Sequence, residues 1–219
     1  KFGRNVWAGA LCYSLMVICF VFANKITSSG NVILIQYAAP IYVALFSFYF
    51  LGEKATKIDW LAIVIILFGL GCFFYEDLTF EKRWGNILAV FSGLGFAGLT
   101  LFMRKEKNAK PIDCVLLGNI ITFIVCIPFY YNGTTQGIMP WVIVIFLGFV
   151  QLGLAYILFS TAIKYVKALD AIIYPVIEPL LNPMLTFLFL GEQMSPIALI
   201  GGALVITGVI GRGVLQISN

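Results

Sequence analysis

The stretch "YAAPIYVALFSFYFLGE" (37–53) comes back later in the chain as "VIEPLLNPMLTFLFLGE" (176–192). The two copies align without a gap at a shift of 139 residues, which pairs Pro40 with Pro179 and ends both copies on the same LGE triplet. Weaker similarity continues on both sides, from residue 23 to residue 72 of the first copy. The chain therefore contains an internal repeat, and the other segments can be placed relative to it.

The composition indicates a membrane protein. Of the 219 residues, 61% are hydrophobic, 16% are aromatic and only 11% are charged, which is more apolar surface than a soluble core can bury. A helix that crosses roughly 30 Å of hydrocarbon needs about 20 residues, so the length allows several spans. The apolar runs do not alternate with polar residues, as the strands of a barrel would. We expect an all-α, polytopic membrane protein.

Apolar runs between charged or Gly-, Pro- and Asn-rich breaks predict eight transmembrane helices. Their expected ranges are 5–27, 31–51, 58–75, 84–103, 111–131, 139–163, 169–190 and 195–215. The connections are short, so consecutive helices should run antiparallel. Division at the repeat gives a first unit, 1–79, with three helices and a second unit, 80–219, with five.

The basic residues predict how the chain is oriented, because Lys and Arg near helix ends collect on the cytoplasmic side of a membrane. Those at one end of the predicted helices are Lys1, Arg4, Lys54, Lys57, Arg104, Lys105, Lys107, Lys110, Lys164, Lys167 and Arg212. The other end has Lys25, Lys82 and Arg83. This bias places both ends of the chain in the cytoplasm. The two copies of the repeat then cross the membrane in opposite directions.

Inverted repeats are the architecture of many secondary transporters, whose substrate site lies near the middle of the membrane between the two units. At the 139-residue shift, the helices expected at 84–103 and 111–131 have no partners in the chain, because the partners would precede Lys1. We therefore expect a plan of five plus five helices whose first two helices are absent from this chain.

On these residues the chain resembles the EamA family of the drug/metabolite transporter superfamily. The resemblance rests on two Pro-bearing helices that end in "FYFLGE" and "FLFLGE", each followed by a helix with regular glycines, "ILFGLGCFF" and "LVITGVIGRG". It implies a ten-helix carrier of the bacterial inner membrane, with both ends cytoplasmic and a central cavity between two five-helix halves. Members of the family move amino acids, other metabolites or drugs, usually outward.

Glu178 is the residue that we expect to carry function. It lies in the middle of a predicted helix, and a carboxylate at that depth is costly unless it faces a cavity, finds a partner or is protonated. We interpret it as a proton-coupling site or as a binder of a substrate amine. The alternative is a protonated side chain that bonds a neighbouring helix. Tyr174 and Asn182 lie four residues to either side, a spacing that predicts one shared helix face.

Prolines and polar or aromatic residues complete the predicted site. The expected helix breaks are Pro40, Pro175, Pro179 and Pro183, since each proline removes the donor for a carbonyl one turn earlier and either frees that carbonyl for a ligand or only bends the helix. Further cavity candidates on the surrounding helices are Gln36, Gln151, Tyr156, Tyr13 and Phe102. Any of the buried polar groups can instead join neighbouring helices.

Glu53 and Glu192 each follow the end of a copy of the repeated helix at the membrane edge. They are interpreted either as gates at opposite faces or as interfacial carboxylates that cap the next helix or pair with a basic loop residue. Six glycines are expected at close contacts between helices, and they are Gly93, Gly95, Gly98, Gly201, Gly202 and Gly208.

These features predict a secondary active transporter that exports a small metabolite by alternating access. The expected substrate is an amino acid or related zwitterion, an amine or a drug-like compound, because a strongly anionic substrate would require an intramembrane Lys or Arg. The expected partners are this substrate and the lipid bilayer, with protons as a candidate coupling ion. A nucleic-acid partner is not indicated, and a homo-oligomer is left open.

Two other classes of function were weighed. A non-transporting membrane scaffold or assembly partner is the first alternative. A membrane-embedded enzyme is disfavoured because the sequence has no His and no Gly-x-Ser-x-Gly. No metal or cofactor is expected, since the five cysteines lack the spacing of metal ligands.

Overall fold

The computed structural model describes residues 2–78, 82–130, 137–190 and 195–217, and the regular structure in these ranges is helical. The helices are α1 (Arg4–Ile26), α2 (Ser29–Gln36), α3 (Ala39–Leu51), α4 (Lys57–Phe73), α5 (Arg83–Lys105), α6 (Ile112–Tyr130), α7 (Met139–Phe146), α8 (Ala155–Ala162), α9 (Ala168–Ile173), α10 (Glu178–Leu190) and α11 (Pro196–Ile217). Three short segments are η1 (Tyr75–Asp77) and η3 (Tyr174–Ile177), both 3₁₀-helical, and η2 (Leu147–Leu154), which is π-helical. The predicted all-α fold is confirmed.

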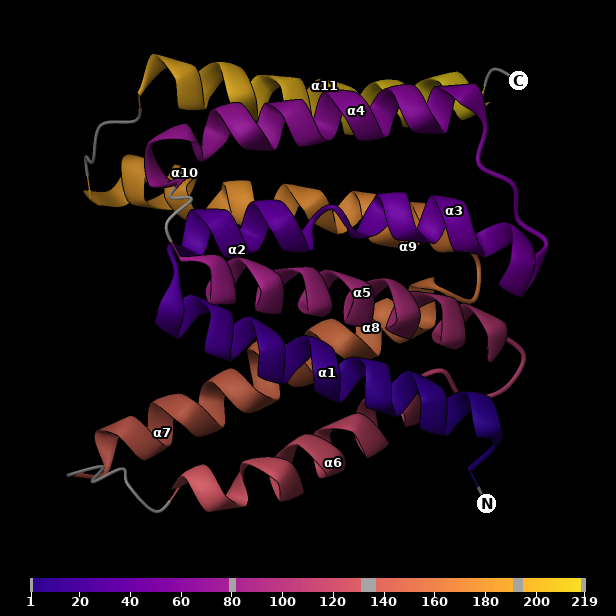
Figure 1. Ribbon diagram of the computed structural model, residues 1–219, viewed down its shortest axis with the longest axis vertical. Coiled ribbons are helices and arrows are strands. Elements are labelled where there is room, and N and C mark those ends of the chain that lie inside the picture. The colour runs from indigo at the N-terminus through magenta and orange to yellow at the C-terminus, as the bar shows by residue number, and fades with distance from the viewer. Residues whose placement is uncertain (1, 79–81, 131–136, 191–194, 218–219) are drawn as a thin grey trace.

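Within the described ranges, six segments are long and apolar enough to cross a membrane. They are Arg4–Ile26, Ser29–Leu51, Arg83–Lys105, Ile112–Phe129, Met139–Ala162 and Pro196–Gln216. The other two predicted spans correspond to α4, which has 17 residues, and to the interrupted segment from α9 to α10. Figure 1 shows α4 running alongside α11 as part of the same bundle.

The helices lie side by side, and both chain termini are at the same end of the bundle (Figure 1). The helix α1 packs along α5 and α6, α4 packs along α11, and α3 packs against α5 and α9. One apolar cluster lies between α3, α4, α9 and α11, and a second joins α1, α5 and α6. The two copies of the repeated helix therefore contact each other, through the packing of α3 on α9.

The contact between α4 and α11 is symmetric, because equivalent residues of the two copies make equivalent contacts. A Cβ added to Gly69 would lie 2.9 Å from Cγ2 of Val205, and a Cβ added to Gly208 would lie 2.9 Å from Cγ1 of Ile66. By the 139-residue shift, Gly208 corresponds to Gly69 and Val205 corresponds to Ile66. Each helix thus presents the same two positions to the other, as the two halves of a self-complementary contact do.

Four of the other five glycines singled out in the sequence also lie at close helix contacts, whereas a Cβ on Gly202 would lie at an ordinary 3.5 Å from the ring of Phe73. A Cβ on Gly95 would lie 2.8 Å from the carbonyl oxygen of Cys12, and one on Gly201 would lie 2.5 Å from that of Gly69. A Cβ on Gly93 would lie 3.1 Å from the carbonyl oxygen of Gln36. Only a residue without a side chain lets the backbones approach so closely.

Candidate functional site

Both copies of the repeated helix are interrupted, and at equivalent positions. In the first copy α2 ends at Gln36 and α3 begins at Ala39. In the second copy η3 separates α9 from α10, which begins at Glu178. By the 139-residue shift, the bounds of α3 coincide with those of α10. The break between α2 and α3 is visible in Figure 1, with α9 behind α3.

Proline chemistry explains the second interruption. Pro179 has no N–H, so the carbonyl of Pro175 cannot receive the α-helical hydrogen bond from four residues later. This carbonyl instead accepts from the backbone N–H of Glu178 and from the hydroxyl of Tyr37, at 3.2 Å. Pro40 occupies the second position of α3, where a missing N–H is tolerated. The Tyr37 hydrogen bond therefore joins the two interruptions directly.

Aromatic side chains surround this junction. Tyr37 is buried, and its ring packs edge-on against Phe96 of α5, with 6.4 Å between centroids. Glu178 lies within electrostatic range of the phenols of Tyr37 and Tyr156. Tyr156 in turn packs edge-on against Tyr13, at 5.2 Å. Glu178 is exposed in the single chain and has no side-chain hydrogen bond to the residues that the structure describes. The acid thus lies near phenols from the α2–α3 break and from α8.

Two of the other sequence candidates join helices to each other. The hydroxyl of Tyr13 donates to Oδ1 of Asn119 at 3.1 Å and links α1 to α6. Nε2 of Gln36 donates to Oγ of Ser92 at 2.8 Å, and that hydroxyl donates to the carbonyl of Met16 at 2.9 Å. These contacts fix α2 and α1 against α5.

Three further candidates lie away from Glu178. Phe102 packs edge-on against Phe50, with 5.8 Å between ring centroids. Gln151 is exposed within the π-helical η2. A Cβ on Gly213 would lie 3.6 Å from the hydroxyl of Tyr174, which places this phenol at α11. Because η3 is 3₁₀-helical, Tyr174 and Glu178 do not follow one continuous α-helical face. The side chains of Asn182 and Pro183, and all of Glu192, lie outside the described part of the chain.

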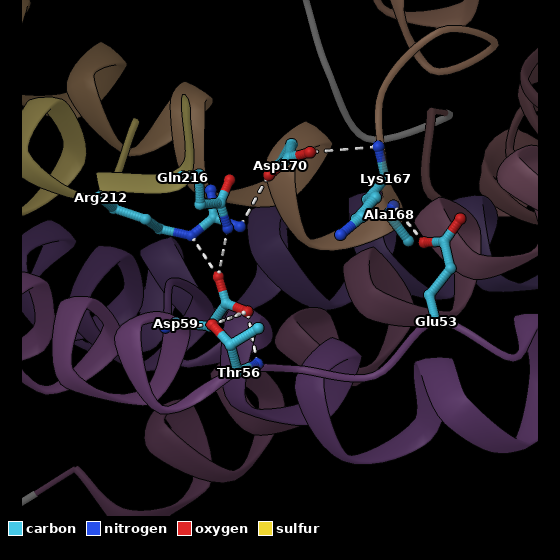
Figure 2. A network of polar contacts seen from close by, with 8 residues as sticks. All are labelled: Glu53, Thr56, Asp59, Lys167, Ala168, Asp170, Arg212 and Gln216. Atoms are coloured by element: carbon cyan, nitrogen blue, oxygen red, sulfur yellow. Dashed lines mark hydrogen bonds and ion pairs between the residues drawn. The ribbon is translucent and has the colours of Figure 1, made fainter. Parts of the chain in front are cut away.

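A charge network lies at the end of the bundle that holds both termini (Figure 2). Oε1 of Glu53 accepts from Nε of Arg104 at 2.8 Å, and Oε2 accepts from the backbone N–H of Ala168, the first residue of α9, also at 2.8 Å. Nη1 of Arg104 donates to the carbonyls of Ile163 at 3.0 Å and Lys164 at 2.9 Å. Glu53 therefore makes both contacts expected of a cap, to a helix N-terminus and to a basic residue.

The same end contains a buried arginine between two aspartates. Nε of Arg212 donates to Oδ1 of Asp59 at 2.7 Å, and its Nη2 lies 2.7 Å from Oδ1 of Asp170. Nε2 of Gln216 also donates to Oδ1 of Asp59, at 2.7 Å. Oδ2 of Asp59 accepts from the N–H and the hydroxyl of Thr56 in a capping box. Arg212 is only 2% exposed, so its charge is neutralised inside the protein.

The sequence analysis missed Asp59 and Asp170 as parts of a site. Each is the third residue of a helix, α4 or α9, that begins at the basic end of the bundle. Arg212 lies in the glycine-rich part of α11 and belongs to the same end by topology. An arginine inside an apolar helix, with two first-turn aspartates at the same membrane edge, was the available signal.

The symmetry of the repeat is broken at this ion pair. By the 139-residue shift, Asp59 corresponds to Ala198 and Arg212 corresponds to Phe73. Ala198 and Phe73 both belong to the apolar cluster around α4 and α11. A buried ion pair at one end of this helix pair therefore has an apolar counterpart at the other end.

Paired, interrupted helices in an inverted repeat define the class of membrane transporters built from two opposed units. The chain belongs to the EamA-like transporter family, which it matches over residues 2–75 and 83–212. It is thus a multi-pass transporter of the drug/metabolite transporter superfamily.

Several transporters are similar along most of the chain. A transporter from Archaeoglobus fulgidus is 30% identical over 211 residues, which cover 94% of this chain and 75% of the relative. The pseudopaline exporter CntI of Pseudomonas aeruginosa is 23% identical and covers 90% of this chain and 70% of its own length. The threonine/homoserine exporter RhtA of Escherichia coli K12 is 23% identical, over 83% of this chain and 61% of its own.

The fold itself is present in a solved crystal structure. That structure superposes with a TM-score of 0.79 over 98% of this chain and 77% of its own, at 18% sequence identity. The similarity bears on the arrangement of the helices alone.

Proposed function

We propose that the chain is a secondary active transporter that exports a small metabolite by alternating access. The observation that carries this proposal is the meeting of the two interrupted helices, where the hydroxyl of Tyr37 from one copy donates to the carbonyl of Pro175 in the other. Interrupted helices at the interface of inverted repeats are where such carriers bind substrates and coupling ions. The binding site is therefore proposed beside this junction.

Glu178 is proposed to bind the ammonium group of the substrate or to exchange a proton with it. It lies within electrostatic range of Tyr37 and Tyr156, and an aromatic surface beside a carboxylate favours a cationic group through the ring quadrupole. The buried Arg212 is already paired with Asp59 and Asp170, so it is not free to receive an anionic substrate. These contacts favour a zwitterion, an amine or a cationic drug-like compound.

The relatives with named substrates support the same direction of transport. RhtA is a threonine/homoserine exporter and CntI is a pseudopaline exporter. We therefore propose outward transport across a bacterial inner membrane, with both ends of this chain in the cytoplasm, as the basic residues indicate.

Transport by the purified full-length gene product in proteoliposomes tests the proposal. Vesicles loaded with threonine, homoserine, a polyamine or a cationic dye should release at least one of them faster than protein-free vesicles, and a pH gradient should change the rate. Vesicles with the Glu178→Gln variant at the same protein density provide the comparison. If no compound is released faster than from protein-free vesicles, a scaffold or assembly function becomes the better account.

A further inference from the structure

We infer that two linked ion-pair groups, Glu53 with Arg104 and Arg212 with Asp59 and Asp170, form a lock that closes the transport pathway at the end of the bundle where both termini lie. The inference rests on the proposed function in one respect, because it assigns the opening of the lock to a transport cycle. The contacts of the lock and the test below do not depend on which substrate is carried.

Each half of the lock crosses between the two copies of the repeat. Glu53 follows α3 of the first copy and holds the N-terminus of α9 of the second, through the N–H of Ala168 (Figure 2). Arg212 of α11 joins Asp59 of α4 to Asp170 of α9. The helix α9 cannot move away from α3 and α4 without breaking the Glu53 contact and separating Asp170 from the Asp59–Arg212 pair. In the structure this end of the bundle is therefore held closed.

The helix α9 can change its angle at the adjoining segment η3. It is a short helix, Ala168–Ile173, and it continues into the 3₁₀-helical η3 with Pro175 and Pro179 nearby. Irregular backbone of this kind absorbs changes of angle that a continuous helix resists. Movement of α9 about η3 would move Asp170 and leave the Asp59–Arg212 pair between α4 and α11 intact.

Not every polar atom of the lock has a hydrogen bond among the described residues, and this favours its opening. Nη1 of the buried Arg212 has no hydrogen-bond partner among the described residues, and the 2.7 Å contact between Nη2 and Asp170 is an ion pair without hydrogen-bond geometry. A cavity of about 10 Å³ borders Ser47, Glu53 and Arg212, enough for a single water. Buried charges that are incompletely bonded give back little of their desolvation cost. Separation of Asp170 from Arg212 therefore breaks an ion pair but no hydrogen bond, which favours this contact as the one that opens.

The lock belongs to one end of the α4–α11 pair. By the repeat, Asp59 and Arg212 correspond to the apolar residues Ala198 and Phe73, whereas Glu53 corresponds to Glu192 and Asp170 corresponds to Asn31. The two ends of this helix pair are thus held by different forces, ionic at the end with the termini and apolar at the other. Neutralising a charge should loosen the first end and leave the second unchanged.

Accessibility of Ser47 tests the inference. This side chain is 2% exposed, borders the cavity beneath the lock and donates to the carbonyl of Glu53 at 2.8 Å. A Ser47→Cys variant of the full-length protein in lipid nanodiscs is treated with a membrane-impermeant maleimide. Labelling at position 47 is then read by peptide mass spectrometry, which separates it from labelling of the native cysteines. Nanodiscs expose both faces, so the result does not depend on orientation.

The variant Asp170→Asn leaves the Asp59–Arg212 pair neutral, and Glu53→Gln breaks the separate pair with Arg104. Each should raise the labelling rate at position 47 by roughly fivefold or more, since each removes one partly buried ion pair. The matched control Asp113→Asn, in the first turn of α6 at the same end, should leave the rate unchanged.

Unchanged labelling in both folded variants, or an equal increase in the control, would overturn the lock. If Asp170→Asn does not give folded protein, the result for Glu53→Gln decides. Labelling requires no substrate, so increased labelling without transport in proteoliposomes would contradict the proposed function and leave the lock in place.

Discussion

The charge of Glu178 gives the most direct prediction at the scale of the residue. If the carboxylate exchanges protons with the substrate, Glu178→Gln should remove the pH dependence of transport and leave a folded protein, because an amide keeps the shape and loses the proton. Rates in proteoliposomes between pH 5.5 and 8.5 measure this. Glu76→Gln, at an exposed glutamate of η1, is the matched control and should keep the pH profile. A pH profile in Glu178→Gln like that of the parent would exclude the proton-coupling role.

The hydroxyl of Tyr37 should contribute measurably to stability. Tyr37→Phe removes the hydrogen bond to the carbonyl of Pro175, which keeps its second donor, the N–H of Glu178. A loss of about 1 kcal/mol is expected, or a fall in Tm of about 2–4 °C for a chain of this size. Thermal unfolding in detergent measures it. Tyr49→Phe, at a tyrosine that is 81% exposed, should change Tm by much less.

Stability should depend strongly on the charge of Arg212. Arg212→Gln leaves Asp59 and Asp170 without their cation inside the protein, and loss of one partner from such a group costs about 3–5 kcal/mol. The variant is expected to unfold at a much lower temperature or to be poorly produced. Lys57→Gln removes an exposed charge from the same end and should be nearly neutral. Equal Tm values for the two variants would show that the buried pairs contribute little.

The sequence predicted single residues unequally well. The carboxylate of Glu178 could be singled out because a charge in an apolar run is visible in the sequence. The partners of Arg212 gave a weaker signal, because Asp59 and Asp170 are common first-turn residues and only their shared membrane edge with Arg212 connects them before α4 and α9 meet α11. Gln36 has the same pattern as a cavity residue in sequence, and only the position of Ser92 on α5 shows that it joins helices.

At the scale of the element, the helices were predicted to within a few residues, and the interruptions lie next to prolines that were named as expected breaks, Pro40 in the first copy and Pro175 and Pro179 in the second. The range 31–51 was predicted as one helix, whereas α2 ends at Gln36 and α3 begins at Ala39. Pro40 was an expected break, but the sequence did not show whether this proline only bends the helix or, as found, follows the start of a new one. The π-helical η2 carries no proline and no charge, so nothing local distinguishes it from the α-helices on either side.

The contact between α4 and α11 makes a prediction for two glycines of one helix. Gly69→Ala would place a Cβ 2.8 Å from the carbonyl oxygen of Gly201, so the helices must separate, whereas Gly71 has open space around its Cβ position. Gly69→Ala should lower the Tm. Gly71→Ala should be neutral or raise it, since alanine favours a helix by up to about 1 kcal/mol over glycine. Thermal unfolding of the two variants in one detergent compares them, and a Gly69→Ala variant as stable as Gly71→Ala would contradict the packing.

At the scale of the whole molecule, the two copies of the repeat are similar in their helix packing and differ in some of their charged residues. The middle of the α4–α11 contact repeats exactly where backbone packing is needed, at Gly69 and Gly208. The copies share the acid that ends the LGE triplet, Glu53 and Glu192, but differ at two other acids, because Glu178 corresponds to Ala39 and Asp59 corresponds to Ala198. Under the proposed alternating access, the shared backbone plan would let the pathway open at either end, and the differing charges would give the two ends different properties.

The orientation of the whole molecule is a prediction that the basic residues make. Eleven of the 14 Lys and Arg side chains lie on the side of the predicted helices that holds both termini, so this side should face the cytoplasm. A cysteine in place of Lys107, at this end, should react with an impermeant maleimide only in inverted membrane vesicles. A cysteine in place of Tyr75, which is 63% exposed in η1 at the opposite end, should react in intact cells. The reverse pattern would place the Arg212 lock on the outer face. Export would then have to begin with the opening of the opposite end, where Phe73 and Ala198 make apolar contacts.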